Sequence, residues 1–182
     1  HIEDVARALH MDSLAFRRKN MMPVGYVDGF SKNENYSDSL NQCIEKGMEY
    51  IGYERKQAEY AKESGPVRHV GMAIFWYNTA VWPISLESSS CRMVLNQDGS
   101  VQLQMGETEI GQGADTAFAQ MAAETLGIPF KDVHVISTQD TDITPFGLGA
   151  YASRQTYIGG FSIKQTALMM KERILKYAYE LT

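Results

Sequence analysis

The chain has 182 residues, of which 44% are hydrophobic and 21% are charged, and its formal net charge is −5. This composition is typical of soluble globular proteins, and the length allows one or two compact domains with a real core. The sequence contains no run of about 18 apolar residues, so no transmembrane helix is predicted. Because the net charge is negative and no basic residues cluster, neither nucleic acid nor a membrane surface is an expected partner.

Cysteine usage and the start of the chain indicate the compartment and the kind of gene product. Cys43 and Cys91 form neither a disulfide framework nor a zinc-binding spacing, and the four scattered histidines add no metal motif. We therefore expect reduced thiols and a cytoplasmic protein. The chain starts at His1, without an initiator methionine or the features of a signal peptide, which predicts a piece of a longer protein.

The first third of the chain is predicted to be helical. Residues 2–19 carry apolar side chains at helical spacing and predict a helix, a turn and a short second helix. Residues 37–51 predict another helix, and the charged stretch 54–66 is typical of a solvated face and a linker that ends at the breaker Gly65-Pro66. We therefore predict that residues 1–64 form a helical N-terminal segment with a linker.

The remaining residues, 65–182, are predicted to form an α+β portion. Aromatic and branched residues over 70–87 indicate a buried strand with an irregular extension. Alternating residues on both sides of Asp98-Gly99 predict a β-hairpin, because this dipeptide accepts the positive φ angles of a tight turn. Three elements follow, namely a helix over 114–128, a strand over 132–138 and a long helix over 155–181. This order predicts the α+β class with a mixed β-sheet and packed helices, without the regular alternation of a doubly wound fold.

The loop GETEIGQGAD, residues 106–115, joins the predicted hairpin to the next helix. Glycine-rich turns that enter a helix can bind anions, because free backbone N–H groups and the helix dipole point at the bound group. Gln112 adds an amide that both donates and accepts hydrogen bonds, which suits a pterin or an oxo group. The loop has neither the Lys-Ser/Thr pair of a Walker loop nor the spacing of a dinucleotide fingerprint. A plain turn between hairpin and helix is the alternative.

A second loop with similar chemistry precedes the last predicted helix. Gly147 and Gly149 are followed by the polar run 153–156, in which hydroxyls and Arg154 could hold a diphosphate. The run taken alone could also be a capping segment. Two such loops on either side of one predicted strand favour a phosphorylated cofactor with polar edges.

Six elements, in order, carry a resemblance to a known family. They are the opening helix that ends in FRRKN, the DGSVQLQMG hairpin, the E-x-G-Q-G loop, the helix that ends in LGIP, the DT…P turn and GAYASR. The sequence resembles the molybdenum-cofactor-binding region of xanthine dehydrogenases, in the aldehyde oxidase and xanthine dehydrogenase family. The resemblance implies part of a molybdenum-cofactor-binding domain that holds molybdopterin in the intact enzyme, with FAD and 2Fe-2S clusters on partner subunits or domains.

The resemblance also implies roles for single residues. Gln112 is similar to the glutamine that hydrogen-bonds the pterin beside the metal, and the GAYASR loop to the segment that passes the metal and contacts the pterin and its phosphate. Val81 and Trp82 lie about where the family places substrate-facing residues, and a core position is the alternative for Trp82. The predicted cofactor-binding residues are Gly111, Gln112, Gly113, Ala150, Tyr151, Ala152, Ser153 and Arg154.

No catalytic residue and no metal ligand is assigned within the chain. Family members use a glutamate as general base in a segment downstream of the GAYASR loop, which we expect beyond Thr182. Glu107 and Glu109 are expected to support the loop instead. The resemblance implies a full-length enzyme of the xanthine or hypoxanthine dehydrogenase type, which hydroxylates a purine or related N-heterocycle with oxygen from water, and an isolated chain that is inactive.

Expected partners are the remaining segments of the molybdenum subunit, the FAD and iron-sulfur subunits, and the purine or N-heterocycle substrate. Two alternatives stay open. One is a non-catalytic truncated paralogue that acts as a partner- or phosphate-binding module. The other lies within the enzyme class and takes an aldehyde or a different N-heterocycle as substrate.

Overall fold

The computed structural model describes residues 1–64, 68–137 and 140–182. The chain divides into two compact units, His1–Trp76 and Tyr77–Thr182. The domain boundary predicted at residues 64 and 65 stays a prediction, and its Gly65-Pro66 pair lies outside the described residues.

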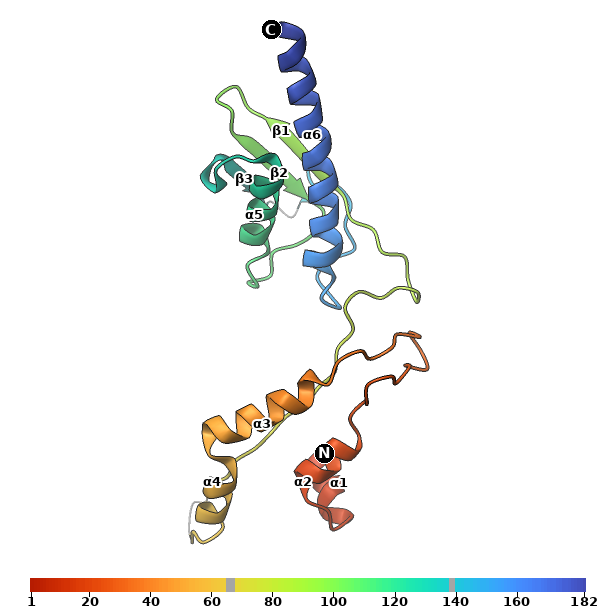
Figure 1. Ribbon diagram of the computed structural model, residues 1–182, viewed down its shortest axis with the longest axis vertical. Coiled ribbons are helices and arrows are strands. Elements are labelled where there is room, and N and C mark those ends of the chain that lie inside the picture. Colours follow the sequence, from red (N-terminus) through yellow and green to blue (C-terminus); the bar gives the residue numbers. More distant parts are fainter. Residues whose placement is uncertain (65–67, 138–139) are drawn as a thin grey trace. The chain divides into compact units, whose positions relative to one another are not determined.

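The first unit is helical (Figure 1). Its helices are α1 (Ile2–Ala8), α2 (Ser13–Lys19), α3 (Ser39–Ile51) and α4 (Tyr53–Tyr60). Helix α1 contacts α2, and α3 contacts α4. The carboxylate of Asp12 accepts a hydrogen bond of 2.8 Å from the N–H of Ala15 and so caps the start of α2. The helix, turn and short helix predicted for residues 2–19 are confirmed.

Helix α4 corrects the interpretation of the charged stretch 54–66. Gly52 has a φ of 63°, which ends α3, and a new helix starts directly after it. Most residues of α4 are good helix formers, so the charges lie on a mainly exposed helix where a linker was predicted. The solvated face predicted for this stretch is thus part of a helix, and the linker prediction is wrong over residues 54–60.

The second unit contains a three-stranded mixed sheet in the order β1-β2-β3. Its strands are β1 (Cys91–Leu95), β2 (Val101–Met105) and β3 (Val133–Ile136). Strands β1 and β2 pair antiparallel as a hairpin, and β3 pairs parallel with β2. The predicted α+β class with a mixed sheet is confirmed.

In the hairpin turn, only one of the two residues expected to have a positive φ, Gly99, has one. Gly99 has a φ of 86°, which glycine adopts without steric cost. Asp98 keeps a negative φ, and its carboxylate accepts hydrogen bonds from the N–H of Ser100 at 2.9 Å and from its hydroxyl at 2.7 Å. The turn is a three-residue loop closed by the N–H of Asn96, which donates to the carbonyl of Ser100 at 2.8 Å.

Two helices, α5 (Ala114–Leu126) and α6 (Gly160–Leu181), pack on one face of the sheet (Figure 1). Along β2 the odd-numbered residues 101–105 are buried against them, and Gln102 and Gln104 between them are only partly buried. Phe118 is fully buried, and a side chain of this size contributes about 1.5–3 kcal/mol by leaving water. The main core consists of Leu103, Met105, Ala114, Phe118, Ala119, Ala122, Ala123, Val133 and Ile163.

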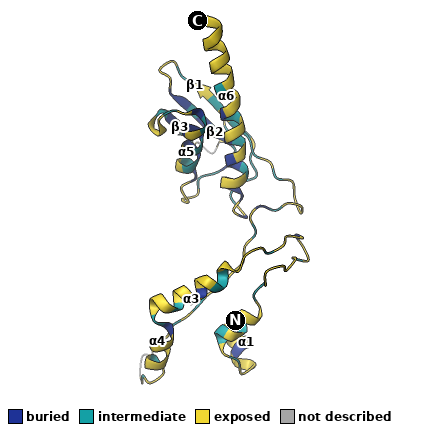
Figure 2. Ribbon diagram, in the orientation of Figure 1, coloured by how far each residue is buried: buried dark blue, intermediate teal, exposed yellow. Residues whose placement is uncertain are grey.

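Helix α6 is buried only in its first half. Ile163 and Ala167 are fully buried, whereas every residue from Glu172 onwards is exposed (Figure 2). Within the described ranges, no helix is both long and apolar enough to cross a membrane.

The strand predicted within residues 70–87 is wrong. Phe75 is 82% exposed and Tyr77 61% exposed, and among the described residues no part of this segment joins the sheet. A strand is stable only where a neighbour takes its backbone hydrogen bonds, so aromatic and branched composition alone does not determine it. The end of the segment instead bonds to the loop that follows β3, where Tyr77 and Ala80 each make one hydrogen bond with Ala152.

Two glycines allow the loops after β2 and β3 to cross. A Cβ atom on Gly106 would lie 2.2 Å from the carbonyl oxygen of Phe146, and a Cβ atom on Gly147 would lie 2.1 Å from the carbonyl oxygen of Gly106. No side chain fits at either position, because both distances are far below van der Waals contact. This crossing brings the GETEIGQGAD loop next to the loop that carries GAYASR.

Candidate functional site

The two glycine-rich loops meet at one pocket of about 440 Å³ in the second unit. Its volume lies within the range of about 300–1,000 Å³ that is typical of small-molecule and cofactor sites. The lining residues are Tyr77, Ile110, Gln112, Ala150, Tyr151, Ala152, Ser153, Arg154, Gln155 and Thr156. Six of the eight predicted cofactor-binding residues are among them, and Gly111 and Gly113 flank Gln112 in the chain. The structure therefore brings the two predicted motifs together.

The GQG turn owes its shape to glycine backbones and to Glu109. Gly111 and Gly113 have φ angles of 98° and 87°, and an added Cβ would meet nothing within 4 Å, so the space beside them is open. The Glu109 carboxylate accepts hydrogen bonds from the N–H groups of Gly111 at 2.6 Å, Gly113 at 3.1 Å and Asp115 at 3.0 Å. These N–H groups, Asp115 first and Gly113 next, hold the pKa of Glu109 below its ordinary value. Glu109 thus stays a carboxylate and supports the start of α5.

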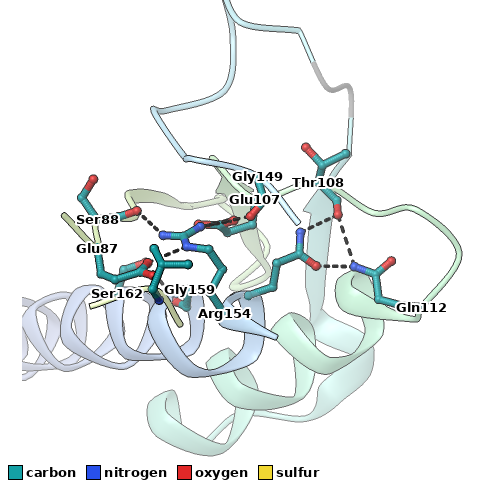
Figure 3. A network of polar contacts seen from close by, with 11 residues as sticks. Glu87, Ser88, Glu107, Thr108, Gln112, Gly149, Arg154, Gly159 and Ser162 are labelled. Atoms are coloured by element: carbon teal, nitrogen blue, oxygen red, sulfur yellow. Dashed lines mark hydrogen bonds and ion pairs between the residues drawn. The ribbon is translucent and has the colours of Figure 1, made fainter. Parts of the chain in front are cut away.

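Gln112 lies in a small network of amide groups (Figure 3). Its Oε1 accepts a hydrogen bond of 2.7 Å from the N–H of Ile110, and its Nε2 donates to the Oε1 of Gln155 and, at 3.3 Å, to the carbonyl of Thr108. Gln155 Nε2 donates to the same Thr108 carbonyl at 2.6 Å. Both ends of the Gln112 amide are therefore held.

Gln155 was not among the predicted site residues. It is 8% exposed and begins the one-turn π-helix η2 (Gln155–Gly159) directly before α6. Such π turns occur often at functional sites. The only signal in the sequence was its place in the polar run after Arg154, and nothing there indicated that it contacts Gln112.

Arg154 is fully buried between two carboxylates (Figure 3). Its Nε donates to Glu87 at 2.6 Å, and its Nη1 donates to both oxygens of Glu107 at 2.8 and 2.9 Å. Nη1 also reaches the carbonyl of Gly149 at 3.1 Å, and Nη2 that of Ser88 at 2.5 Å. These carboxylates raise the pKa of Arg154 although burial alone would lower it. All three guanidinium nitrogens donate to protein acceptors, and contact with a cofactor phosphate stays a prediction.

The Glu87–Arg154–Glu107 triad joins three segments that are distant in sequence. Glu107 follows β2, Arg154 ends the GAYASR loop, and Glu87 belongs to the segment before β1. The side chains of Arg154 and Glu107 are 0% exposed and that of Glu87 is 8% exposed, so removing the positive charge would leave two buried negative ones. This role for Glu107 agrees with the expectation that it supports the loop.

Ala152 and Ser153 hold an uncommon backbone conformation at the edge of the pocket. Their φ angles are 47° and 49°, in the left-handed region that residues with a Cβ rarely occupy. The N–H of Ala152 donates to the hydroxyl of Tyr77 at 2.8 Å, and its carbonyl accepts from the N–H of Ala80 at 2.6 Å. Such conformations persist where surrounding contacts determine them, and they cluster at functional sites.

The two predicted substrate-facing residues lie in the segment that makes these contacts. The N–H of Val81 donates to Glu87 at 2.6 Å, so Val81 is tied to the buried triad. Trp82 is 63% exposed, which shows that the core position considered for it is wrong. Neither residue is among those lining the pocket, and their contact with substrate stays a prediction.

The pocket offers hydrogen-bonding groups and no acid–base pair. Among the described residues, its lining contains no histidine and no carboxylate. Likewise, no cluster of three or more histidine, cysteine or acidic side chains that could hold a metal ion is found in the described part of the chain. The described lining therefore offers hydrogen-bonding groups to a polar ligand.

Comparison with known proteins decides which ligand class this is. A family model described as a molybdopterin cofactor-binding domain matches residues 46–182. The chain belongs to this family. The match includes the whole pocket, and the open space beside Gly111 and Gly113, the Gln112 amide and the free volume of about 440 Å³ fit a pterin with polar edges.

Individual relatives agree with the family model. The xanthine dehydrogenase molybdenum-binding subunit of Escherichia coli O157:H7 is 44% identical over 178 residues, which cover 97% of this chain and 24% of the relative. The carbon monoxide dehydrogenase large chain of Afipia carboxidovorans is 30% identical over 197 residues, 94% of this chain and 23% of the relative. The solved quinoline 2-oxidoreductase of Pseudomonas putida 86 matches with a TM-score of 0.62 at 25% identity, over 95% of this chain and 23% of that chain.

Two conclusions follow from these matches. The predicted resemblance to molybdenum-binding subunits of xanthine dehydrogenases is confirmed. The chain spans about a quarter of the length of the curated relatives it matches.

Proposed function

We propose that the chain forms part of the molybdopterin site of a molybdenum hydroxylase of the xanthine or hypoxanthine dehydrogenase type, which acts on a purine or related N-heterocycle. The observation that carries this proposal is the pocket in which Gln112 meets residues 150–156. Identity of 44% to a xanthine dehydrogenase subunit supports the purine assignment. When bound, molybdopterin supplies a molybdenum centre that takes up the two electrons released by hydroxylation.

The residues of this chain would bind and orient the cofactor. Gln112 presents its amide to a polar edge of the pterin, and residues 150–153 line the pocket beside it. Arg154 keeps this loop in place through its bonds to Glu87, Glu107 and the carbonyl of Gly149. Since all three guanidinium nitrogens already donate to protein acceptors, we assign Arg154 this positioning role, and its direct contact with the cofactor phosphate is a separate proposal.

The substrate side of the proposal rests on Val81 and Trp82. Their segment is bonded to Ala152 and to Glu87, so it is held against the same loop that lines the pocket. The exposed Trp82 indole offers an apolar surface on which a flat heterocycle can stack. A general base is expected from another segment of the full-length protein, because the lining of the described pocket offers none. By the same reasoning, the 182 residues alone are inactive.

The proposed partners are the remaining segments of the molybdenum subunit and subunits that carry FAD and 2Fe-2S clusters. The names of two relatives, a molybdenum-binding subunit and a large chain, support a multi-subunit assembly. We place the enzyme in the cytoplasm, in keeping with its free cysteines, Cys43 and Cys91.

The test uses the full-length protein that contains these residues, produced together with the enzymes of cofactor synthesis. Mass spectrometry of metals and oxidative release of the pterin give cofactor content, and turnover is compared for hypoxanthine, xanthine and an aldehyde. We expect molybdenum and pterin near one per chain, with a purine as the best substrate. A folded protein without pterin would support the alternative of a binding module, and a preference for the aldehyde would overturn the purine assignment.

A further inference from the structure

We infer that Gln155 is a positioning residue that determines which end of the Gln112 amide is offered to a ligand in the pocket. The inference rests on the proposed function, because the ligand in question is the pterin cofactor. It is carried by the direction of three hydrogen bonds that run from the Thr108 carbonyl through Gln155 and Gln112 to the N–H of Ile110.

The three hydrogen bonds form a relay whose direction is set by the Thr108 carbonyl, a group that can only accept. The Thr108 carbonyl takes a hydrogen bond of 2.6 Å from Gln155, so the amide nitrogen of Gln155 faces it and the amide oxygen faces Gln112. That oxygen in turn requires the nitrogen of Gln112, which leaves the Gln112 oxygen to accept from the N–H of Ile110 at 2.7 Å. Turning either amide over would place oxygen against oxygen and N–H against N–H.

The relay is held in place at Gln155, the amide that bonds to the Thr108 carbonyl. Gln155 is 8% exposed, and its neighbour Arg154 is locked between two buried carboxylates. Gln112 itself is exposed, and a free glutamine side chain at such a position samples several rotamers. Contact with Gln155 therefore restricts the rotamers of Gln112 before a ligand binds. Binding then costs less side-chain entropy, so Gln112 is preorganised.

The relay also leaves one donor for exchange. Gln112 Nε2 has two hydrogens, one for Gln155 and one that makes the longer contact of 3.3 Å with the Thr108 carbonyl. That carbonyl already accepts the shorter bond from Gln155. The second hydrogen can therefore pass to a ligand acceptor without leaving a buried group unsatisfied. The chemistry selected is an acceptor atom of the cofactor, an oxo or carbonyl oxygen or a ring nitrogen.

A double-mutant cycle on the full-length protein tests whether Gln155 acts through Gln112. The variants are Gln112→Met, Gln155→Met and the double variant, and the readout is the rate at which pterin is lost on dilution. Gln112→Met removes about one net hydrogen bond to the cofactor, so we expect it to speed the loss about fivefold to tenfold. Gln155→Met keeps that bond but frees the Gln112 side chain, so we expect it to speed the loss by no more than Gln112→Met does. The double variant should match Gln112→Met alone. If the two effects multiply, Gln155 acts independently and the inference is overturned.

A second variant separates positioning from loss of folding. In Gln155→Glu the carboxylate still accepts from Gln112 but is repelled by the Thr108 carbonyl, whereas the protonated acid has the same donor and acceptor as an amide. Pterin retention by this variant should recover as the pH is lowered towards about 5, since burial raises the pKa of a glutamate. Gln155→Met should show no such recovery. Equal pH profiles for the two variants would contradict the relay.

A matched control and the wild type complete the design. Gln120→Met changes an exposed glutamine of α5 and should keep the wild-type rate of pterin loss. If the wild type holds pterin and Gln112→Met weakens it while Gln155→Met does not, the relay is wrong and the proposed function stands. If the folded wild type holds no pterin, both are overturned.

Discussion

Removal of the positive charge at Arg154 is expected to destabilise the second unit severely. Arg154→Met keeps most of the apolar stem and removes the guanidinium, which leaves Glu87 and Glu107 buried without a cation. Both Glu107 oxygens lose their hydrogen bonds to Nη1, at 2.8 and 2.9 Å. Breaking one buried ion pair costs about 3–5 kcal/mol, and two carboxylates are affected here, so we expect a loss of about 5 kcal/mol.

Urea unfolding followed by far-ultraviolet circular dichroism measures this loss. With a slope of about 2 kcal/mol per molar urea, a loss of about 5 kcal/mol moves the midpoint down by about 2.5 M. Arg92→Met is the matched control, because Arg92 is exposed and its hydrogen bonds within the described ranges go to Gln104 and to a backbone carbonyl. Its free energy of unfolding should change by less than about 1 kcal/mol.

A charge-free replacement of the triad tests the reasoning behind that number. In the triple variant Glu87→Gln, Glu107→Leu and Arg154→Met, no buried charge remains, and such replacements are often neutral. We expect it to recover most of the stability that Arg154→Met loses. A midpoint shift below about 0.5 M for the single variant, or a triple variant that is no more stable than the single one, would refute the account.

Three further predictions concern other parts of the fold. Glu109→Gln should lower the melting temperature at neutral pH. N–H groups depress the pKa of Glu109 in the folded chain, so the stability that this carboxylate contributes is present above the ordinary pKa of 4.5 and is lost as the pH falls through the depressed pKa. The melting temperatures of wild type and variant should therefore converge in acid. Gly147→Ala should cost more than about 3 kcal/mol in a thermal melt because its Cβ has no space, whereas Gly47→Ala inside helix α3 should be neutral or stabilising by up to about 1 kcal/mol. Burial raises the pKa of the Cys91 thiol, so iodoacetamide at pH 8 should alkylate exposed Cys43 at least about tenfold faster, and equal rates in peptide mass spectrometry would count against the packing of β1.

Elements with local signals could be predicted from the sequence. The hairpin over β1 and β2 follows from alternation around a glycine turn, and α5 follows from helical spacing that ends at Gly127. The packing of α5 on the sheet that contains this hairpin follows because the helix and the sheet each have one apolar face. The strand predicted within 70–87 failed for the converse reason, since none of the described strands pairs with it.

The candidate site was predictable only in part. The sequence shows two glycine-rich loops, and the structure adds that they cross at Gly106 and Gly147 and share one pocket. Arg154 was expected to face a phosphate, yet its partners Glu87 and Glu107 lie 67 and 47 residues away in the chain, beyond the reach of any local pattern. The contact between Gln112 and Gln155, 43 residues apart, was invisible for the same reason.

The central claim is that molybdopterin lies between the GQG turn and the GAYASR loop. Hydrogen–deuterium exchange on the full-length protein, with and without cofactor, tests it most directly. We predict slower exchange on cofactor binding in peptides that cover residues 108–114 and 149–157, and unchanged exchange in the hairpin turn at residues 96–100. Protection elsewhere in the protein, with both loops unchanged, would contradict the account.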